Sequence, residues 1–230
     1  MGHCLCGKLR CTKRPTGRVY LAAMLFFTLF FASCVGVHSD ITIRKDGSGT
    51  IALEYRLSRE LESLGKLDGN QGWLPLPVGK ADFERTVARV QGLSLGSFNT
   101  KITGQDSITQ VKLNFTNLDA LARFLDSTGQ GVSLVREGEK TRMTLGFSGA
   151  AGAQNRELMT LVSEAMESYT LDFGLTLPNE AELRILGENG QVLSAPPAGT
   201  LMVQGSRIVY SSPMAELLSS PGRVVLDILW

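Results

Sequence analysis

After residue 40, apolar and polar side chains alternate along most of the chain, with the period of two that is typical of half-buried β-strands. Two such runs within 41–57 are separated by Asp46-Gly47-Ser48-Gly49, which predicts a β-hairpin because these residues tolerate a tight turn. A second hairpin is predicted around Asn189-Gly190, the strongest two-residue turn signal. The alternation predicts further strands at 93–104, 107–117, 131–137, 139–149, 170–178, 200–212 and 222–230.

Other segments show the helical spacing of apolar residues. Short helices are predicted at 59–65, 81–92 and 214–220, and Asn117 is expected to cap a helix over 118–129. The longest helix, 154–169, has an apolar stripe roughly a hundred degrees wide opposite a charged face, which is typical of a helix packed on a sheet. Together these elements predict an α+β fold: a curved, mainly antiparallel sheet with the amphipathic helix packed on it and hairpin extensions.

A different pattern precedes the alternating region. Residues 19–33 form an apolar tract of about fifteen residues, shorter than the ~20 that a membrane-spanning helix needs. Five basic residues and no acidic residue come before this tract, and it ends in Phe31-Ala32-Ser33-Cys34. Such an arrangement is typical of an export signal. The last four residues resemble the bacterial lipobox, in its looser spirochaete-like form because Phe31 stands where leucine is usual.

The lipobox resemblance implies cleavage between Ser33 and Cys34 and a diacylglyceryl thioether on Cys34, with a further acyl chain, such as palmitate, usual on its amine. Acyl chains contribute ~0.8 kcal/mol for each buried CH₂, so two or three of them hold a protein on a membrane. We therefore expect a signal peptide (1–33), a lipidated tether (34–40) and a single extracytoplasmic domain (41–230). The anchor fits the cell membrane or the outer membrane, on the periplasmic or extracellular face. The alternatives are an uncleaved signal anchor and an export signal with a coincidental cysteine.

Composition narrows the chemistry of the exported part. Without residues 1–33 the net charge is −4, since all 22 acidic residues but only 18 of the 23 basic ones remain. A mildly acidic chain without a basic run argues against a nucleic-acid partner. The exported part keeps only Cys34, which lipid would consume, and His38, which lies in the expected tether. We therefore expect no disulfide, no metal centre, no cofactor and no histidine-dependent nucleophile.

Catalysis by carboxylates alone stays open as a minor alternative, with Glu54, Asp106, Asp119 and Asp172 as candidates. A glycosidase would need two carboxylates ~5–9 Å apart. The sequence pattern pairs none of the four. The chain is accordingly expected not to be an enzyme, and no catalytic residue is assigned.

The order of elements resembles that of bacterial lipoproteins of the LppM type. The resemblance is carried by the lipobox, the opening hairpin ITIRKDGSGTIALEY, the strand-to-helix segment FTNLDALARFL and the closing segment LLSSPGRVVLDILW. It covers roughly residues 41–230. It implies a mixed α+β domain outside the cytoplasm, with a helix over a curved sheet and a similarity to lipid-binding folds, and it supplies no catalytic residue.

Two functions are consistent with these observations. The first is a non-enzymatic structural or interaction module of the cell envelope, anchored to the membrane by its lipid. Its contact with a partner protein would be the last strand, if that lies at a sheet edge, or the apolar loop WLPLP with Trp73, Leu74 and Leu76. The same loop also fits plain packing on the core through its tryptophan.

The second function is binding or transport of a lipid or another apolar ligand. The ligand would lie between the concave sheet and the helix 154–169, because pockets for such ligands are mainly apolar. The side chains expected to face it are Leu158, Val162 and Met166 of the helix, with Phe115 and Phe147 of the sheet.

Overall fold

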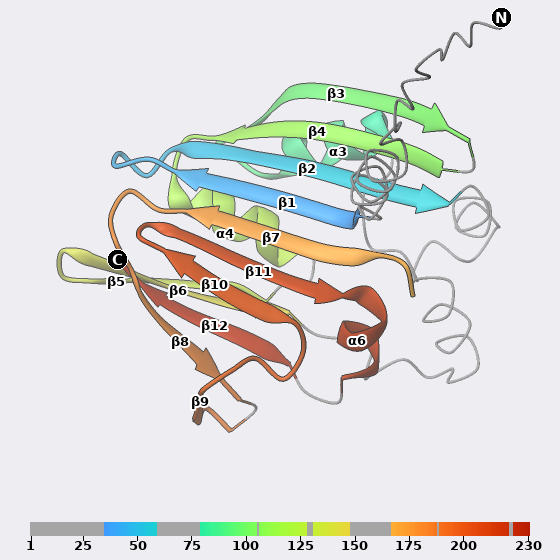
Figure 1. The fold of residues 1–230 in the computed structure, drawn as a ribbon. Helices are drawn as coiled ribbons and strands as arrows, with labels where there is room; N and C mark the ends of the chain where they lie inside the picture. The colour runs from blue at the N-terminus through green and yellow to red at the C-terminus, as the bar shows by residue number, and fades with distance from the viewer. Residues whose placement is uncertain are drawn as a thin grey trace, which may run out of the picture. The chain divides into compact units, whose positions relative to one another are not determined.

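The computed structural model describes residues 35–58, 79–104, 106–127, 131–147, 167–187, 189–220 and 223–230. Chain contacts divide the protein into two units, and the second unit, Val35–Trp230, contains every described element. These elements are mainly β-strands in two sheets, with the helices α3 (Lys80–Arg89), α4 (Leu118–Ser127) and α6 (Met214–Ser219) (Figure 1).

The larger sheet has seven strands in the order β10-β11-β7-β1-β2-β4-β3. Their bounds are Thr200–Gln204 (β10), Arg207–Pro213 (β11), Thr170–Thr176 (β7), Val35–Ile43 (β1), Gly49–Ser58 (β2), Asp106–Phe115 (β4) and Leu93–Thr103 (β3). Neighbouring strands are antiparallel except β1 and β7, which are parallel and bring two distant parts of the sequence side by side at the centre of the sheet (Figure 1).

The smaller sheet has five antiparallel strands in the order β5-β6-β12-β8-β9. Their bounds are Ser133–Glu137 (β5), Lys140–Phe147 (β6), Val224–Leu229 (β12), Glu182–Leu186 (β8) and Val192–Leu193 (β9). The strand that closes the chain, β12, is therefore the central strand of this sheet. The last strand was considered as a partner contact only if it lay at a sheet edge, and that condition is not met.

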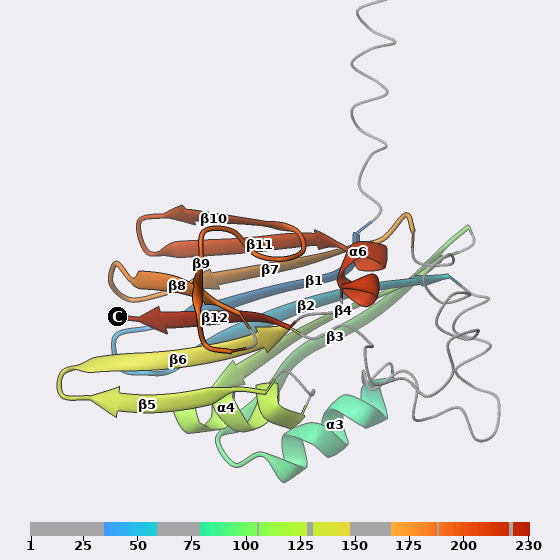
Figure 2. The same ribbon diagram turned by 90° about the horizontal axis from the view of Figure 1, so that it is seen from below.

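The period-two pattern places the apolar residues of β1, β2 and β4 on one face of the larger sheet, and that face is covered in two parts (Figure 2). The smaller sheet covers the side of β7 and β11, where the ring of Phe147 lies 5.2 Å from that of Phe173 and 5.0 Å from that of Tyr210. The helices α3 and α4 cover the side of β2, β4 and β3. There the ring of Phe83 on α3 lies 5.9 Å from that of Phe98 and 6.3 Å from that of Tyr55.

Local sequence signals explain the ends of the two longer helices. Asn117 caps α4 as expected, because its Oδ1 atom accepts a hydrogen bond of 2.9 Å from the backbone N–H of Ala120. At the start of α3, the carboxylate of Asp82 accepts a hydrogen bond of 3.0 Å from the backbone N–H of Gly79. Both caps satisfy backbone donors that a first helical turn leaves without partners.

The predicted α+β class is only partly confirmed. Helices do pack on an extensive, mainly antiparallel sheet, but the described chain is mainly β and forms two facing sheets where one curved sheet was expected. Most of the helix predicted at 154–169 lies outside the described residues, and Glu167 and Ser168 at its predicted end form a turn. The predicted helix at 59–65 lies outside the described residues as well.

The predicted tether over 34–40 is not a tether in its described part. Residues 35–40 belong to β1, where His38 pairs with Glu54 of β2 on one side and Asp172 of β7 on the other. The sequence pattern of the first hairpin continues towards the cysteine: Val35, Val37 and Ser39 alternate with Gly36, His38 and Asp40. The folded domain therefore begins next to Cys34.

Candidate functional site

The site residues proposed from the sequence lie outside the described part of the chain. These are the cleavage and lipidation residues and the two groups of candidate contacts: Ser33, Cys34, Trp73, Leu74, Leu76, Leu158, Val162 and Met166. Their roles stay predictions.

The two described residues that were expected to face an apolar ligand are Phe115 and Phe147. They are 2% and 4% exposed, respectively. A side chain that lines a chamber wide enough for water retains accessible surface, whereas these two are enclosed by neighbouring side chains. Both phenylalanines therefore serve the packing of the core.

A groove lies at the end of the larger sheet where β1 ends and β2 begins. Its volume is about 920 Å³. Turns and element ends from separate parts of the chain form its walls: the β1–β2 turn, the start of α4, the β5–β6 hairpin, the segment after β7, and Trp230. In Figure 1 this is the end of the molecule at which the C-terminus is marked. The alternation of strands and turns along the sequence gives no sign that these five segments meet.

The groove combines half-buried apolar side chains with an exposed charged rim. Leu118, Leu134 and Trp230 are half-buried, and the backbone of Trp230 is fixed by hydrogen bonds of 2.8 and 3.1 Å to Thr141. The rim carries three basic and three acidic residues, so its formal charges balance: Arg44, Lys45 and Arg136 against Asp46, Asp119 and Glu139. An aromatic and aliphatic centre within a polar rim is the usual anatomy of a protein–protein contact site.

The β1–β2 turn holds one wall of the groove in a fixed shape. Oδ1 of Asp46 accepts hydrogen bonds from the hydroxyl of Ser48 at 2.7 Å and from its backbone N–H at 3.0 Å. These bonds lower the pKa of Asp46 below its usual value. Gly47, with a φ of 80°, supplies the left-handed residue that the turn requires.

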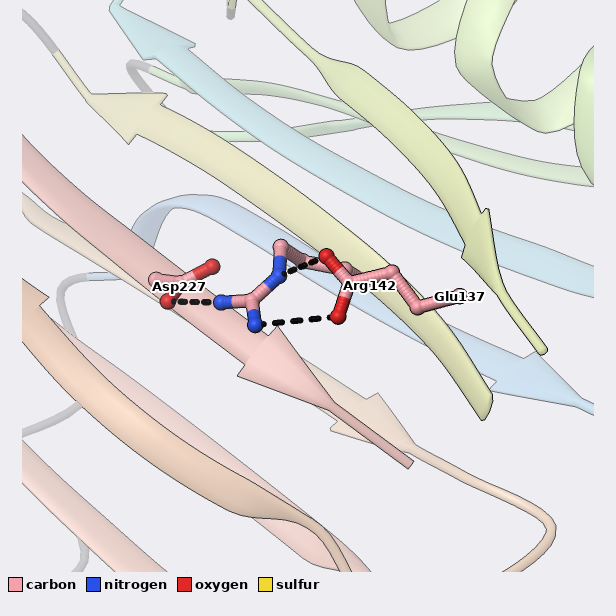
Figure 3. Close-up of polar contacts among 3 residues, drawn as sticks. All are labelled: Glu137, Arg142 and Asp227. Carbon is pink, nitrogen blue, oxygen red and sulfur yellow. Dashed lines mark hydrogen bonds and ion pairs between the residues drawn. The ribbon is translucent and has the colours of Figure 1, made fainter. Parts of the chain in front are cut away.

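Another wall, the β5–β6 hairpin, is tied to β12 of the same sheet by Arg142 (Figure 3). Its guanidinium donates to both carboxylate oxygens of Glu137, from Nε at 2.6 Å and from Nη2 at 3.1 Å. Its Nη1 donates at 2.6 Å to Oδ2 of Asp227, which is only 7% exposed. One side chain on β6 thus ties β5 to β12, and the two carboxylates raise the pKa of Arg142.

The opposite face of the larger sheet carries a polar row that the sequence did not reveal. The pairing register aligns Ser211 (β11), Asp172 (β7), His38 (β1), Glu54 (β2) and Gln110 (β4). The Ser211 hydroxyl donates to Oδ1 of Asp172 at 2.6 Å, and Nε2 of Gln110 donates to Glu54 at 2.8 Å.

This row brings together two of the four candidate carboxylates, with His38 between them, and it removes the reason for setting His38 aside. The serine hydroxyl, however, donates directly to a carboxylate, whereas a hydrolytic triad needs the histidine between the two. Of the other two candidates, Asp119 lies on the rim of the groove and Asp106 begins β4. No group of three acidic, histidine or cysteine side chains suited to a metal occurs among the described residues.

Among the described residues, no helix is both long and apolar enough to cross a bilayer.

No protein-family model matches the chain, and no curated protein sequence matches it. Among solved structures, the chain is similar to the folded domain of LppM from Mycobacterium tuberculosis, determined by NMR. The TM-score is 0.47 and the sequence identity 9%, over 86% of this chain and 90% of that one. Nothing in these comparisons points to spirochaete lipoproteins.

Proposed function

We propose that this protein is a non-enzymatic interaction module of the bacterial cell envelope, held on a membrane by lipid on Cys34. The proposal places it on the periplasmic or extracellular face, as the lipobox implies. The observation that carries the proposal is the groove, with its apolar centre and its balanced charged rim. A rim with both signs of charge suits a protein surface that also carries both signs, and it suits neither a polyanion nor a bare cation.

The position of the groove fits an anchored module. β1 begins at Val35, next to the proposed lipid, and ends at Ile43, which lines the groove. Nine strand residues at ~3.3 Å each separate the two ends by roughly 30 Å. The groove therefore lies at the end of β1 away from the anchor.

Site-specific photo-crosslinking tests this proposal. A photoreactive amino acid is placed at Asn179, an exposed residue of the groove, in the full chain within intact cells; the matched control is Asn99, an exposed residue on β3. We expect a discrete crosslinked protein from position 179 only. It should be lost with Arg136→Glu on the rim but retained with Lys112→Glu elsewhere. Equal adducts from both positions, or none from position 179, would contradict a role for the groove.

A module that binds or carries an apolar ligand is the alternative function. Its proposed contacts Leu158, Val162 and Met166 lie outside the described residues, and no observation on the described ones favours it.

A further inference from the structure

The exposed large apolar side chains of the described chain all lie on strands at the edges of the two sheets. The larger sheet ends in β10 and β3, and the smaller one in β5 and β9. The exposed residues are Met202 and Val203 on β10, Ile102 on β3, Val135 on β5 and Val192 on β9. An edge strand has unpaired backbone groups, and apolar side chains beside those groups favour pairing with another strand.

Three of these edges carry features that discourage pairing. β3 has an irregularity in its register between Leu95 and Ser97, and it carries Lys101. β5 carries Arg136 and Glu137, and β9 is two residues long. β10, Thr200–Gln204, has neither a charge nor a proline nor a bulge. Figure 2 shows it at the end of the larger sheet, beyond β11. β10 is thus the edge best suited to accept another strand.

The hairpin geometry defines which groups of β10 point outward. Gly205 and Ser206 form a two-residue turn between β10 and β11, so the flanking pair Gln204 and Arg207 exchanges hydrogen bonds. Hydrogen-bonded and non-bonded pairs alternate along an antiparallel ladder. The N–H and C=O groups of Leu201 and Val203 therefore point away from β11, towards the open edge.

We propose that β10 pairs with β10 of a second copy of this chain, antiparallel and around a two-fold axis at Met202. This register sets Leu201 opposite Val203 of the other copy, and vice versa, so that the outward N–H and C=O groups of each pair exchange hydrogen bonds. The order of residues in β10 is polar, three apolar, polar. The antiparallel register therefore matches Thr200 with Gln204 and Met202 with itself. Without charges on β10, the two strands do not repel each other.

The pairing would join two seven-stranded sheets into one continuous sheet. The two-fold axis is perpendicular to the joined sheet, so the same face of both copies points in the same direction. β10 runs parallel to β1, so the β1 strands of the two copies run in opposite directions. Two copies anchored in one membrane can therefore form the pair when the joined sheet lies along that membrane. This inference is independent of the groove, which lies at the ends of other strands.

Cysteine crosslinking tests the register. Met202→Cys is introduced into the full chain in its membrane, with Ile102→Cys on the opposite edge of the same sheet as the control; both side chains are exposed, at 56% and 67%. Directly opposite residues in an antiparallel pair have Cβ atoms ~4.5–5.5 Å apart, close enough for a disulfide. We expect mild oxidation to give a crosslinked dimer with Met202→Cys beyond the level in the parent chain, and no such increase with Ile102→Cys. Equal crosslinking at both positions, or a crosslink from position 202 to a different protein, would overturn the proposal.

Charge on the edge provides a second test that needs no disulfide. The detergent-solubilised full chain is expected to sediment as a dimer, and Ile102→Lys is expected to leave it a dimer. Met202→Lys should give a monomer at the same concentration, since two lysines would face each other across the axis. Unchanged thermal unfolding would show that the variant is folded. A monomeric parent chain, or a Met202→Lys variant that stays dimeric, would contradict the proposed pairing.

Discussion

Arg207 on β11 forms an ion pair with Asp40 on β1 although β7 lies between these two strands. Nη2 of Arg207 lies 2.5 Å from Oδ2 of Asp40. The pair crosses β7 above Gly174, where a Cβ atom would lie 2.8 Å from that carboxylate oxygen and 3.1 Å from that nitrogen. The glycine in the intervening strand β7 thus leaves the space in which the two side chains meet.

The first prediction concerns this space. Replacing glycine by alanine restricts the unfolded chain and by itself raises the free energy of unfolding by ~0.4–1 kcal/mol. At position 174 the new methyl group should also displace the ion pair, and the loss of this pair should cancel that gain. In an Asp40→Ala background the obstruction is gone, and the same substitution should stabilise the protein by that amount. Urea unfolding of the four chains in this cycle measures the difference. An equal effect of Gly174→Ala in both backgrounds would show that the ion pair does not depend on the glycine.

The second prediction concerns the contact between the sheets. Phe147→Ala removes a ring that packs on Phe173 and Tyr210, and it should lower the free energy of unfolding by about 3–5 kcal/mol. Val135→Ala on the exposed edge β5 is the matched control and should change it by less than about 0.5 kcal/mol. A loss below about 1 kcal/mol for Phe147→Ala would mean that the two sheets do not share a packed core at this point.

The third prediction concerns the stability of the protein at acidic pH. Hydrogen bonds from Arg142 lower the pKa of Glu137, and those from Lys140 lower the pKa of Glu182. Such groups stabilise the fold above their unfolded pKa of about 4.3, and that stability is lost as the pH falls through the folded pKa. The free energy of unfolding should therefore decrease below about pH 4.3. Glu137→Gln should flatten this part of the profile, and Glu180→Gln should not. Identical profiles for the two variants would argue against the ion pair of Arg142 with Glu137.

Much of the local structure was predictable because short-range signals encode it. The turns at Gly47 and Gly190 have the positive φ that glycine favours, and they join paired strands where hairpins were predicted. The cap at Asn117 and the short helix after Pro213 are confirmed for the same reason. In each case the determining residues lie within a few positions of the feature.

The assembly of these elements was not predictable from local patterns. β1 pairs with β7, and β12 inserts between β6 and β8, through contacts between segments far apart in the sequence. Periodicity shows which face of each strand is buried, but not which strand lies beside it. For the same reason, His38 was assigned to a tether, and the five segments of the groove were not connected.

The fourth prediction concerns the anchor. Replacement of Cys34 by alanine should abolish labelling by a radioactive fatty acid and move the protein out of the membrane fraction, because the acyl chains would provide the attachment. Cys11→Ala, within the predicted signal peptide, should change neither result. A Cys34→Ala protein that stays in the membrane without label would indicate an uncleaved signal anchor, and persistent label would exclude Cys34 as the lipidated residue.

The central claim is that the anchored domain acts through its surface and not through a ligand enclosed in its core. Native mass spectrometry of the full chain purified from membranes, followed by organic extraction, tests it most directly. The expected result is the mass of the processed chain with its covalent acyl groups, and no stoichiometric extractable lipid even after incubation with membrane extract. A lipid released by the solvent in a one-to-one ratio would overturn the proposed function and establish a lipid-binding protein.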